Sequence, residues 1–346
     1  MNRRGFLFSA AGSAVAFSTF LRPGISFADA NSRQEMIESW RRRIQSILDK
    51  KSLPIIDMEA TYVPGKTHIG KIVQWMDEVG VAQIAFAPAF SPDGQSSLDL
   101  QSKYPGYFIP TTNSGEFPRW PDDPLAFLEV VKGDLKTGNY FLMGEHEFRH
   151  YPSPEQVKAG RTDRDITIPL DGPAGQALFQ LSEETGVAFQ IHYEIEDRLL
   201  PVLEQMLTRY PKAKVIWCHL AMIRYPDRAK TYTPDYVSSL IERFPGLHFD
   251  LAMPPPQEVY GPSGVHDATL YKDGHLDDRW KAVLEKYPDR FVAASDYRPP
   301  IEQMYTNNMQ RQRNLILAEL NEEARHKIAF GNAWRLVTGE SWSGRI

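Results

Sequence analysis

Short apolar runs alternate with longer amphipathic stretches along most of the chain. The apolar runs have the length and the bounding turn residues of buried strands. They span Ile55–Thr61, Gln83–Ala87, Phe108–Thr112, Tyr140–Glu145, Val187–His192, Lys214–His219, Leu247–Leu251 and Phe291–Asp296. The stretches between them repeat apolar residues every three to four positions, as amphipathic helices do. They span Gly70–Val79, Pro124–Thr137, Gly175–Thr185, Leu199–Tyr210, Pro234–Phe244 and Asp278–Tyr287.

This alternation predicts an α/β fold, a single (β/α)₈ TIM barrel with helices covering a wall of parallel strands. An open doubly wound sheet is the competing architecture, but no glycine-rich nucleotide-binding motif follows the predicted strands. Residues Glu35–Lys51 predict an additional N-terminal helix, and Glu302–Phe330 predict helices that close the barrel. Two long loops, Arg149–Leu170 and Met253–Leu276, are expected at the mouth formed by the carboxyl ends of the strands.

The segment PIIDMEATY, residues 54–62, places polar residues on one face of the first predicted strand. Asp57, Glu59 and Thr61 share one parity, whereas Met58 and Ala60 share the other. Side chains alternate between the two faces of a strand, so the polar set is expected to face the barrel interior. Glu59 is then expected near the rim.

Three other predicted strands become polar only where they end. His192 and His219 end consecutive strands, and Asp296 ends the last one. A lone histidine after an apolar strand is more often a hydrogen-bonded core residue, but two such endings favour a shared site because imidazole is a common metal ligand. A buried carboxylate needs a cation or a histidine nearby, so Asp296 is expected to join them unless it caps a turn.

Two further features lie close to these endings. The polar run GEHEFRHY places Glu145 and Glu147 on one strand face and His146 on the other, and an exposed loop is the alternative interpretation. Cys218 has the opposite parity to His219, so we expect it to point away from the mouth as a small core residue. It is the single cysteine of the chain, which excludes an internal disulfide.

The first 30 residues do not match the pattern of the barrel. Arg3-Arg4-Gly5-Phe6-Leu7 is typical of a twin-arginine export signal, and Ala28-Asp29-Ala30 is typical of a signal-peptidase site. We therefore expect residues 1–30 to be a signal peptide, residues 31–346 to be the barrel domain, and the protein to reside in the periplasm. A retained membrane anchor is the alternative, although no other stretch is long and apolar enough to span a bilayer.

The overall charge narrows the choice of partners. The chain of 346 residues has a formal net charge of -5, whereas binding to nucleic acid requires a basic surface. A small-molecule substrate is therefore expected, without nucleic acid and without stable membrane insertion after signal removal.

Taken in order, five motifs resemble the amidohydrolase superfamily, in particular the amidohydrolase-related branch that includes aromatic-acid decarboxylases. They are IDMEAT, GVAFQIHYE, VIWCHLA, RFVAASDYR and FGNAWRL, which together cover most of the chain after residue 30. The resemblance implies a TIM barrel that holds one divalent metal at its mouth. It also implies that His192 is a ligand, that His219 binds the metal or polarises the substrate, and that Asp296 is a ligand and proton shuttle.

The first strand departs from that family pattern. The family has HxH there and the decarboxylases often have ExH, whereas this chain has Glu59-Ala60-Thr61. Threonine is a poor zinc ligand. The metal set implied by the resemblance is therefore Glu59, His192 and Asp296, with zinc or manganese as the ion. Asp296 and His219 are the implied catalytic residues.

Other charged residues are assigned to substrate binding. Arg149, Arg298 or Arg224 is expected to hold a substrate carboxylate in a bidentate manner, and Glu145 is also assigned to substrate binding. The sequence gives no oligomeric state, although barrels of this family often pair as homodimers.

Three functions follow as hypotheses. The first is hydrolysis of a small cyclic or carbonyl compound, such as a lactone, ester or amide, by metal-activated water. The second is non-oxidative decarboxylation of an aromatic or enoic acid, which Glu59 favours. The third is a non-catalytic or weakly metal-binding barrel that acts as a binding protein, which Thr61 favours.

Overall fold

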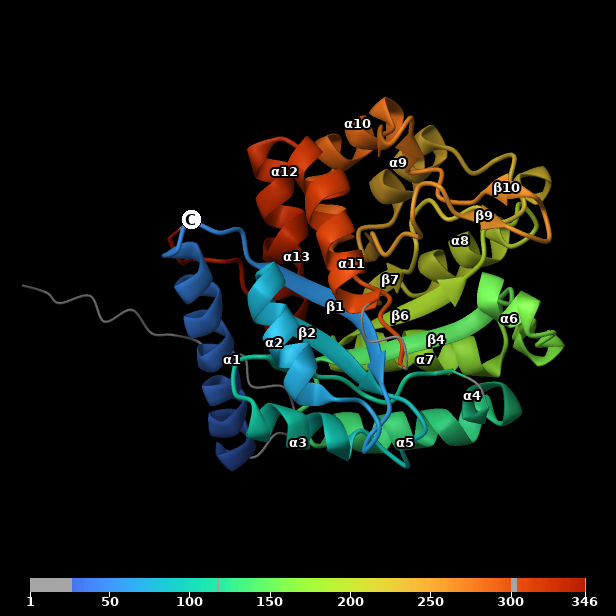
Figure 1. Cartoon of the computed structure of the whole chain (residues 1–346). Helices are drawn as coiled ribbons and strands as arrows, with labels where there is room; N and C mark the ends of the chain where they lie inside the picture. The colour runs from blue at the N-terminus through green and yellow to red at the C-terminus, as the bar shows by residue number, and fades with distance from the viewer. Residues whose placement is uncertain (1–26, 117, 300–303, 346) are drawn as a thin grey trace, which may run out of the picture.

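Eight parallel strands form the wall of a barrel in the computed structural model, which describes residues 27–116, 118–299 and 304–345 (Figure 1). They are β1 (Ile55–Tyr62), β2 (Val81–Pro88), β3 (Phe108–Pro110), β4 (Leu142–His150), β6 (Ala188–Tyr193), β7 (Val215–Trp217), β8 (Leu247–Asp250) and β13 (Phe291–Val292). Each corresponds to one of the eight apolar runs in the sequence. The predicted (β/α)₈ barrel is confirmed.

The strands belong to two hydrogen-bonded sheets that meet at two seams. One sheet has the order β1-β2-β3, and the other has the order β13-β8-β7-β6-β4-β5, where the short β5 (Ile166–Thr167) runs antiparallel to β4. At the first seam the backbone N–H of Thr112 donates to the carbonyl of Leu142 at 3.0 Å. At the second seam the N–H of Thr61 donates to the carbonyl of Tyr297 at 2.8 Å. The segment after β13 therefore lies directly beside β1.

Helices cover the outside of this wall. The α-helices are α1 (Phe27–Leu48), α2 (Ile69–Val79), α3 (Gln95–Lys103), α4 (Arg119–Asp122), α5 (Pro124–Lys136), α6 (Pro154–Lys158), α7 (Pro173–Thr185), α8 (Leu200–Arg209), α9 (Pro234–Arg243), α10 (Asp278–Lys286), α11 (Met304–Arg311), α12 (Glu322–His326) and α13 (Asn332–Thr338). The π-helical turns Gln312–Ile316 and Lys327–Gly331 adjoin α11 and α12. The C-terminal helices thus continue eight residues beyond the predicted end at Phe330.

Local sequence signals account for the helix boundaries. Asp123 caps α5 by accepting a hydrogen bond from the N–H of Ala126, and Pro124 occupies the first turn, where its missing N–H costs nothing. Gly80 ends α2 with a φ of 71°, a left-handed conformation that glycine adopts without steric strain. The same residue leads directly into β2, which keeps the connection short.

The burial of β1 explains the two faces of its sequence. All eight of its residues are buried. Met58 belongs to the hydrophobic core, whereas Asp57 and Glu59 belong to the buried polar set. Oδ1 of Asp57 accepts a hydrogen bond from the N–H of Ser295 at 2.9 Å, across the seam. The parity prediction for this strand is therefore confirmed, and the inner face of β1 carries carboxylates into the barrel.

The long loops contain short structured elements. The loop after β4 contains α6 and β5, and the loop after β8 contains β9 (Val259–Tyr260), β10 (Val265–His266), β11 (Tyr271–Lys272) and β12 (His275–Leu276). The twin-arginine motif expected near Arg3 lies outside the described residues, and the expected cleavage site falls within the first turn of α1. In the part of the chain that the structure describes, no helix is both long and apolar enough to cross a membrane.

Candidate metal centre

Five predicted site residues come from five different parts of the barrel wall. Glu59 lies on β1, Glu145 on β4 and His192 on β6. His219 lies two residues after β7, and Asp296 lies four residues after β13. Because the carboxyl ends of parallel barrel strands converge on one mouth, these distant segments reach a common region.

His192 is held by acceptors at both ring nitrogens. Its Nδ1 lies 2.9 Å from Oε1 of Glu145, and its Nε2 lies 3.1 Å from Oε1 of Glu194. Burial lowers the pKa of His192, but the hydrogen bonds to the two carboxylates outweigh burial and raise it. Glu194 is in turn paired with the buried Arg224. Burial raises the pKa of Glu194, but the charge of Arg224 and the hydrogen bond to His192 together bring it down to about 2. Glu194 therefore stays ionised and orients the imidazole.

His219 is oriented in the same manner by its backbone surroundings. Its Nδ1 lies 2.9 Å from the carbonyl oxygen of Ala252, which can only accept, so this nitrogen carries the hydrogen. Its φ of 63° is unusual for a residue with a side chain, and the N–H of His219 is held by Oδ1 of Asp250 at 2.8 Å. This turn directs Nε2 of His219 into the barrel, where it lies 3.2 Å from Nδ1 of His192.

Carboxylates surround the inward-facing nitrogen of His219. Nε2 lies 3.7 Å from Oε1 of Glu145 and 3.8 Å from Oε1 of Glu59. Burial lowers the pKa of His219, but the hydrogen bond to Glu145 and the charges of Asp296 and Asp250 outweigh burial and raise it to about 9. The local field therefore favours positive charge at this point.

Glu59 is the least satisfied of these groups. It is buried, and neither of its carboxylate oxygens accepts a hydrogen bond from the described residues. Burial raises its pKa well above the usual value, and the charges of Asp250 and Glu145 raise it further. A buried carboxylate without a hydrogen-bond partner is costly, so the folded chain gains from a cation placed against it.

These donors fit a divalent metal ion. The ligand atoms of Glu145, His192 and His219 lie within 4.8 Å of one another, as do those of Glu59, His219 and Asp250. Ligand atoms around a tetrahedral zinc ion lie about 3.4 Å apart. Small side-chain movements would therefore bring the atoms of either three-residue group to the spacing needed to bind one ion. Carboxylate and imidazole donors suit zinc and manganese. The outer nitrogens of both histidines are already hydrogen-bonded, as is usual for metal-bound imidazoles.

The predicted metal ligand Asp296 has a different neighbour in the structure. None of the three-residue groups capable of holding an ion in the described chain includes it. Its side chain is 33% exposed, and its Oδ1 accepts a hydrogen bond from Nε of Arg298 at 2.8 Å. Its backbone N–H donates to the carbonyl of Glu59 at 3.0 Å. Asp296 therefore lies beside the metal donors, and its carboxylate is at the solvent side of the centre.

Arg298 connects most of the acids at the mouth. Its guanidinium pairs with Glu145, with Oε1 of Glu116 at 2.5 Å and with Asp296, and it lies 3.9 Å from Oε1 of Glu59. Burial raises the pKa of Glu145, but the charge of Arg298 and the hydrogen bonds to His192 and His219 together outweigh burial and lower it well below its usual value. This arginine is therefore a resident cation at the entrance to the metal donors.

Glu116 is a site residue that the sequence did not indicate. It lies in an irregular segment between β3 and α4, where no periodic pattern reports its direction. Its Oε1 accepts hydrogen bonds from Oγ1 of Thr61 at 2.9 Å and from Oγ of Ser114 at 2.5 Å. Thr61, which stands where the family pattern has an imidazole, therefore contacts a carboxylate and joins none of the metal-holding groups among the described residues.

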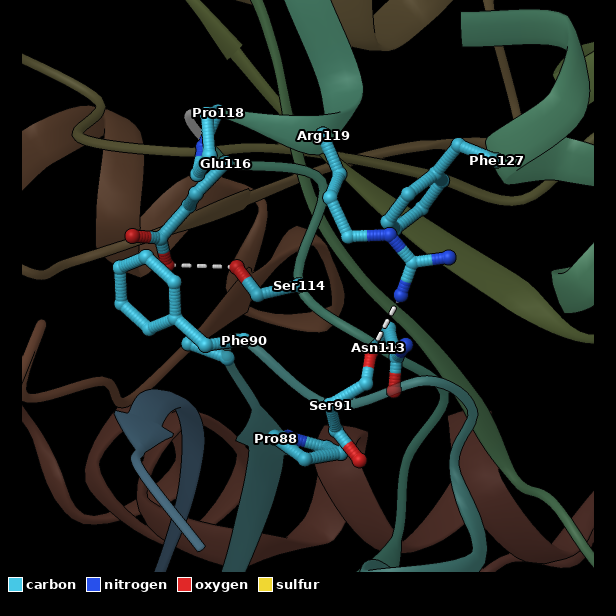
Figure 2. A pocket seen from close by; sticks show the side chains of 10 residues that line it. Pro88, Phe90, Ser91, Asn113, Ser114, Glu116, Pro118, Arg119 and Phe127 are labelled. Atoms are coloured by element: carbon cyan, nitrogen blue, oxygen red, sulfur yellow. Dashed lines mark hydrogen bonds between the residues drawn. The ribbon is translucent and has the colours of Figure 1, made fainter. Parts of the chain in front are cut away.

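A small pocket adjoins Glu116 at the rim of the barrel (Figure 2). Phe90, Ser114 and Arg119 also line it, and the figure shows Ser114 directed toward the Glu116 carboxylate. The volume of about 10 Å³ is the space of about one water molecule. At this volume the pocket is too small for a substrate.

Arg149 and Cys218 are placed differently from their expected positions. Arg149 is buried in ion pairs with Glu196, at 2.9 Å, and with Asp165, so its donors are engaged by the protein. The sulfur of Cys218 lies within 4.8 Å of carboxylate oxygens of Glu59 and Glu145, so the expectation that it points away from the site is wrong. The reason is that β7 ends at Trp217, after which the strand alternation no longer applies.

Comparison with two solved structures at TM-scores above 0.5 agrees with the fold. The organophosphorus hydrolase from Deinococcus radiodurans is 12% identical, with a TM-score of 0.51 over 82% of this chain and 92% of that chain. An organophosphate hydrolase engineered from a weak promiscuous lactonase is 12% identical, with a TM-score of 0.52 over 82% and 95%. A 2,6-dihydroxybenzoate decarboxylase is 14% identical, with a TM-score of 0.47 over 82% and 99%.

Comparison of the sequence gives the family. No curated protein matches the chain significantly. The model of the family described as amidohydrolase matches residues 102–338, which is more than half of the chain and includes His192, His219 and Asp296. The chain belongs to the amidohydrolase family.

Proposed function

We propose that this protein is an exported, metal-dependent hydrolase that acts on a small cyclic or carbonyl substrate, such as a lactone, ester or amide. The observation that carries the proposal is the orientation of the two histidines. The outer nitrogens of His192 and His219 face Glu194 and the Ala252 carbonyl, while their inner nitrogens face each other and Glu145. Glu145, His192 and His219 are thus preorganised donors, with Glu59 beside them.

A divalent cation bound there supplies two effects: it lowers the pKa of a water molecule and it polarises the substrate carbonyl. Asp296 is the residue that moves the proton, because its carboxylate lies at the solvent side of the donors and is partly exposed. It accepts a proton from the attacking water and later donates it to the leaving group. Arg298 keeps this carboxylate in place through its Nε hydrogen bond.

Arg298 supplies positive charge at the mouth, beside the reacting carbonyl. His219 would hold the ion through Nε2, because its Nδ1 hydrogen is directed to the Ala252 carbonyl. Glu194 and Arg224 act through His192 and are positioning residues. The engineered relative that was built from a lactonase supports testing lactones first.

The test is an assay of the metal-loaded protein on lactone, ester and amide panels. We expect hydrolysis with incorporation of one oxygen from water, and we expect Asp296→Asn to lose at least about 100-fold in kcat, because proton transfer by a positioned group contributes about 10²–10⁴-fold. Full activity of Asp296→Asn would contradict the role of that residue. Absence of activity on all panels, together with absence of metal binding, would favour the non-catalytic barrel.

Decarboxylation is a second candidate that Arg298 favours. Its guanidinium lies at the mouth beside Glu59 and Glu145, where a substrate carboxylate would replace one of the acids that Arg298 already holds. In this reaction Asp296 would donate a proton to the carbon that loses carbon dioxide. Release of carbon dioxide from hydroxylated aromatic acids, without uptake of oxygen from water, distinguishes this reaction from hydrolysis.

Export to the periplasm belongs to the same proposal. It is supported by the twin-arginine motif at Arg3-Arg4 and by the small-residue site at Ala28–Ala30. Cell fractionation of the native chain and of the Arg3→Lys, Arg4→Lys double variant tests it. We expect the native chain in the periplasm and the variant in the cytoplasm; equal distribution of the two would contradict export by this route.

A further inference from the structure

The single cysteine of the chain lies within the candidate metal centre. Cys218 follows β7 directly, and its side chain is buried. Its sulfur and one carboxylate oxygen from each of Glu59 and Glu145 lie within 4.8 Å of one another. A cysteine that serves only to fill a core faces apolar groups, whereas this one faces two acids.

A second observation points to a ligand at the same place. Both carboxylate oxygens of Glu59 lack a hydrogen-bond partner among the described residues, and Glu59 is only 3% exposed. Oδ2 of the fully buried Asp250 also lacks a partner there. Glu59 from β1 and Asp250 from β8 converge with the thiol that follows β7 and with Glu145 from β4, which is paired with His192 and Arg298. A cation coordinated between them satisfies the acids that the protein itself leaves without hydrogen bonds.

We propose that Cys218 is a thiolate ligand of the ion in this centre, together with Glu59 and Glu145. The inference rests on the metal centre of the proposed function and adds a cofactor class to it. Binding replaces the S–H bond with a metal–sulfur bond and releases one proton to solvent, without any change in oxidation state. A thiolate is a soft donor, so the centre prefers thiophilic ions such as Zn²⁺ or Cd²⁺ to Mn²⁺.

Cobalt(II) is the probe that reports this bond directly. The full chain, freed of metal with a chelator, is titrated with cobalt chloride while its visible and near-ultraviolet absorption is recorded. We expect visible bands from the bound ion and a near-ultraviolet sulfur-to-cobalt charge-transfer band. Because the chain has one cysteine, such a band has one source. Cys218→Ser is the matched control, and it is expected to keep the visible bands and lose the charge-transfer band.

The second test compares the affinities of the wild type and the variant for metal ions. We expect Cys218→Ser to weaken Cd²⁺ binding at least tenfold and to leave Mn²⁺ binding within about twofold, because manganese prefers oxygen donors. Cys218→Ala replaces the serine variant if the latter does not fold. Bound cobalt without a charge-transfer band, or equal Cd²⁺ affinity in variant and wild type, would overturn the role of Cys218 and leave the centre intact. Failure to bind any of the three ions would overturn the metal centre as well.

Discussion

Nε2 of His219 lies 3.2 Å from Nδ1 of His192, and both nitrogens face into the barrel. The two side chains come from consecutive parallel strands, and each is held from behind by an acceptor, the Ala252 carbonyl or Glu194. This spacing leaves room for a shared proton or for an ion bound by both nitrogens. The nearby carboxylates of Glu59 and Glu145 favour positive charge at that point, which is the basis of the predictions below.

Glu59→Gln is expected to separate stability from metal binding. In the metal-free protein the substitution removes a buried acid without hydrogen bonds and should raise the free energy of unfolding by about 1 kcal/mol or more. It should also weaken zinc binding by more than about 100-fold, since changes to residues that merely orient ligands already cost about 10–100-fold. Urea unfolding with a chelator and calorimetric zinc titration measure the two effects. Loss of stability without loss of affinity would contradict the assignment.

Glu194→Gln tests how His192 is positioned. The amide keeps the size of the side chain but removes the charge that pairs with Arg224 and fixes the Nε2 hydrogen of His192. We expect zinc affinity to fall by about 10–100-fold. The matched control is Glu196→Gln, which alters a nearby carboxylate bound to Arg149 and should leave zinc affinity unchanged. Equal effects of the two variants would mean that Glu194 has only a structural role.

Arg298→Gln is expected to strengthen metal binding while it weakens catalysis. The guanidinium neutralises Glu145 and lies near Glu59, so it opposes a second cation in the same place. Removing the charge of Arg298 should raise zinc affinity by about tenfold. This gain is smaller than the full Coulomb repulsion between two cations held by the same carboxylates. Turnover should fall because Asp296 loses its hydrogen-bond donor. Arg149→Gln is the control with unchanged zinc affinity, and an unchanged affinity in Arg298→Gln would refute the competition.

The pH dependence of stability is expected to depend on His248 in β8. Burial lowers the pKa of this histidine to about 3, helped by the charge of Arg290. Below a pH of about 6.5 the histidine binds a proton in the unfolded chain but stays neutral in the folded chain. Protonation therefore favours the unfolded chain, and the free energy of unfolding falls as the pH is lowered.

Between about pH 7.5 and 5.0 the wild type should therefore lose about 2 kcal/mol more stability than His248→Gln. Urea unfolding of both proteins at the two pH values measures the difference. Parallel pH profiles for the two proteins would show that His248 is protonated in the folded state.

Much of the barrel is readable from the sequence because its strands are buried on both faces and its helices are amphipathic. The parity of β1 was sufficient to place Asp57 and Glu59 inside. The directions of side chains at the ends of strands were harder to predict. Alternation predicts direction only while a strand continues, and β7 stops at Trp217, before the turn at His219 with its positive φ. The direction of Cys218 was mispredicted for that reason.

Residues outside periodic segments carried no usable signal. Glu116 reaches Arg298 and Thr61 from an irregular segment, and only the folded backbone shows this. Glu145 was expected among substrate-binding residues, but its Oε1 lies 2.9 Å from Nδ1 of His192 and it belongs to the metal donors, although the register of β4 and β6 pairs it with Gln190. Long-range pairing of strands decides such neighbours, and the pattern along one segment does not contain it.

The most direct measurement is anomalous diffraction at the zinc absorption edge from crystals of the protein grown with zinc. The account predicts one strong peak enclosed by Glu59, Glu145, His192 and His219, with the signal lost in crystals of a His192→Ala, His219→Ala double variant. A featureless map at this location in fully zinc-saturated crystals, with the inward-facing imidazoles still hydrogen-bonded to the carboxylates, would contradict it.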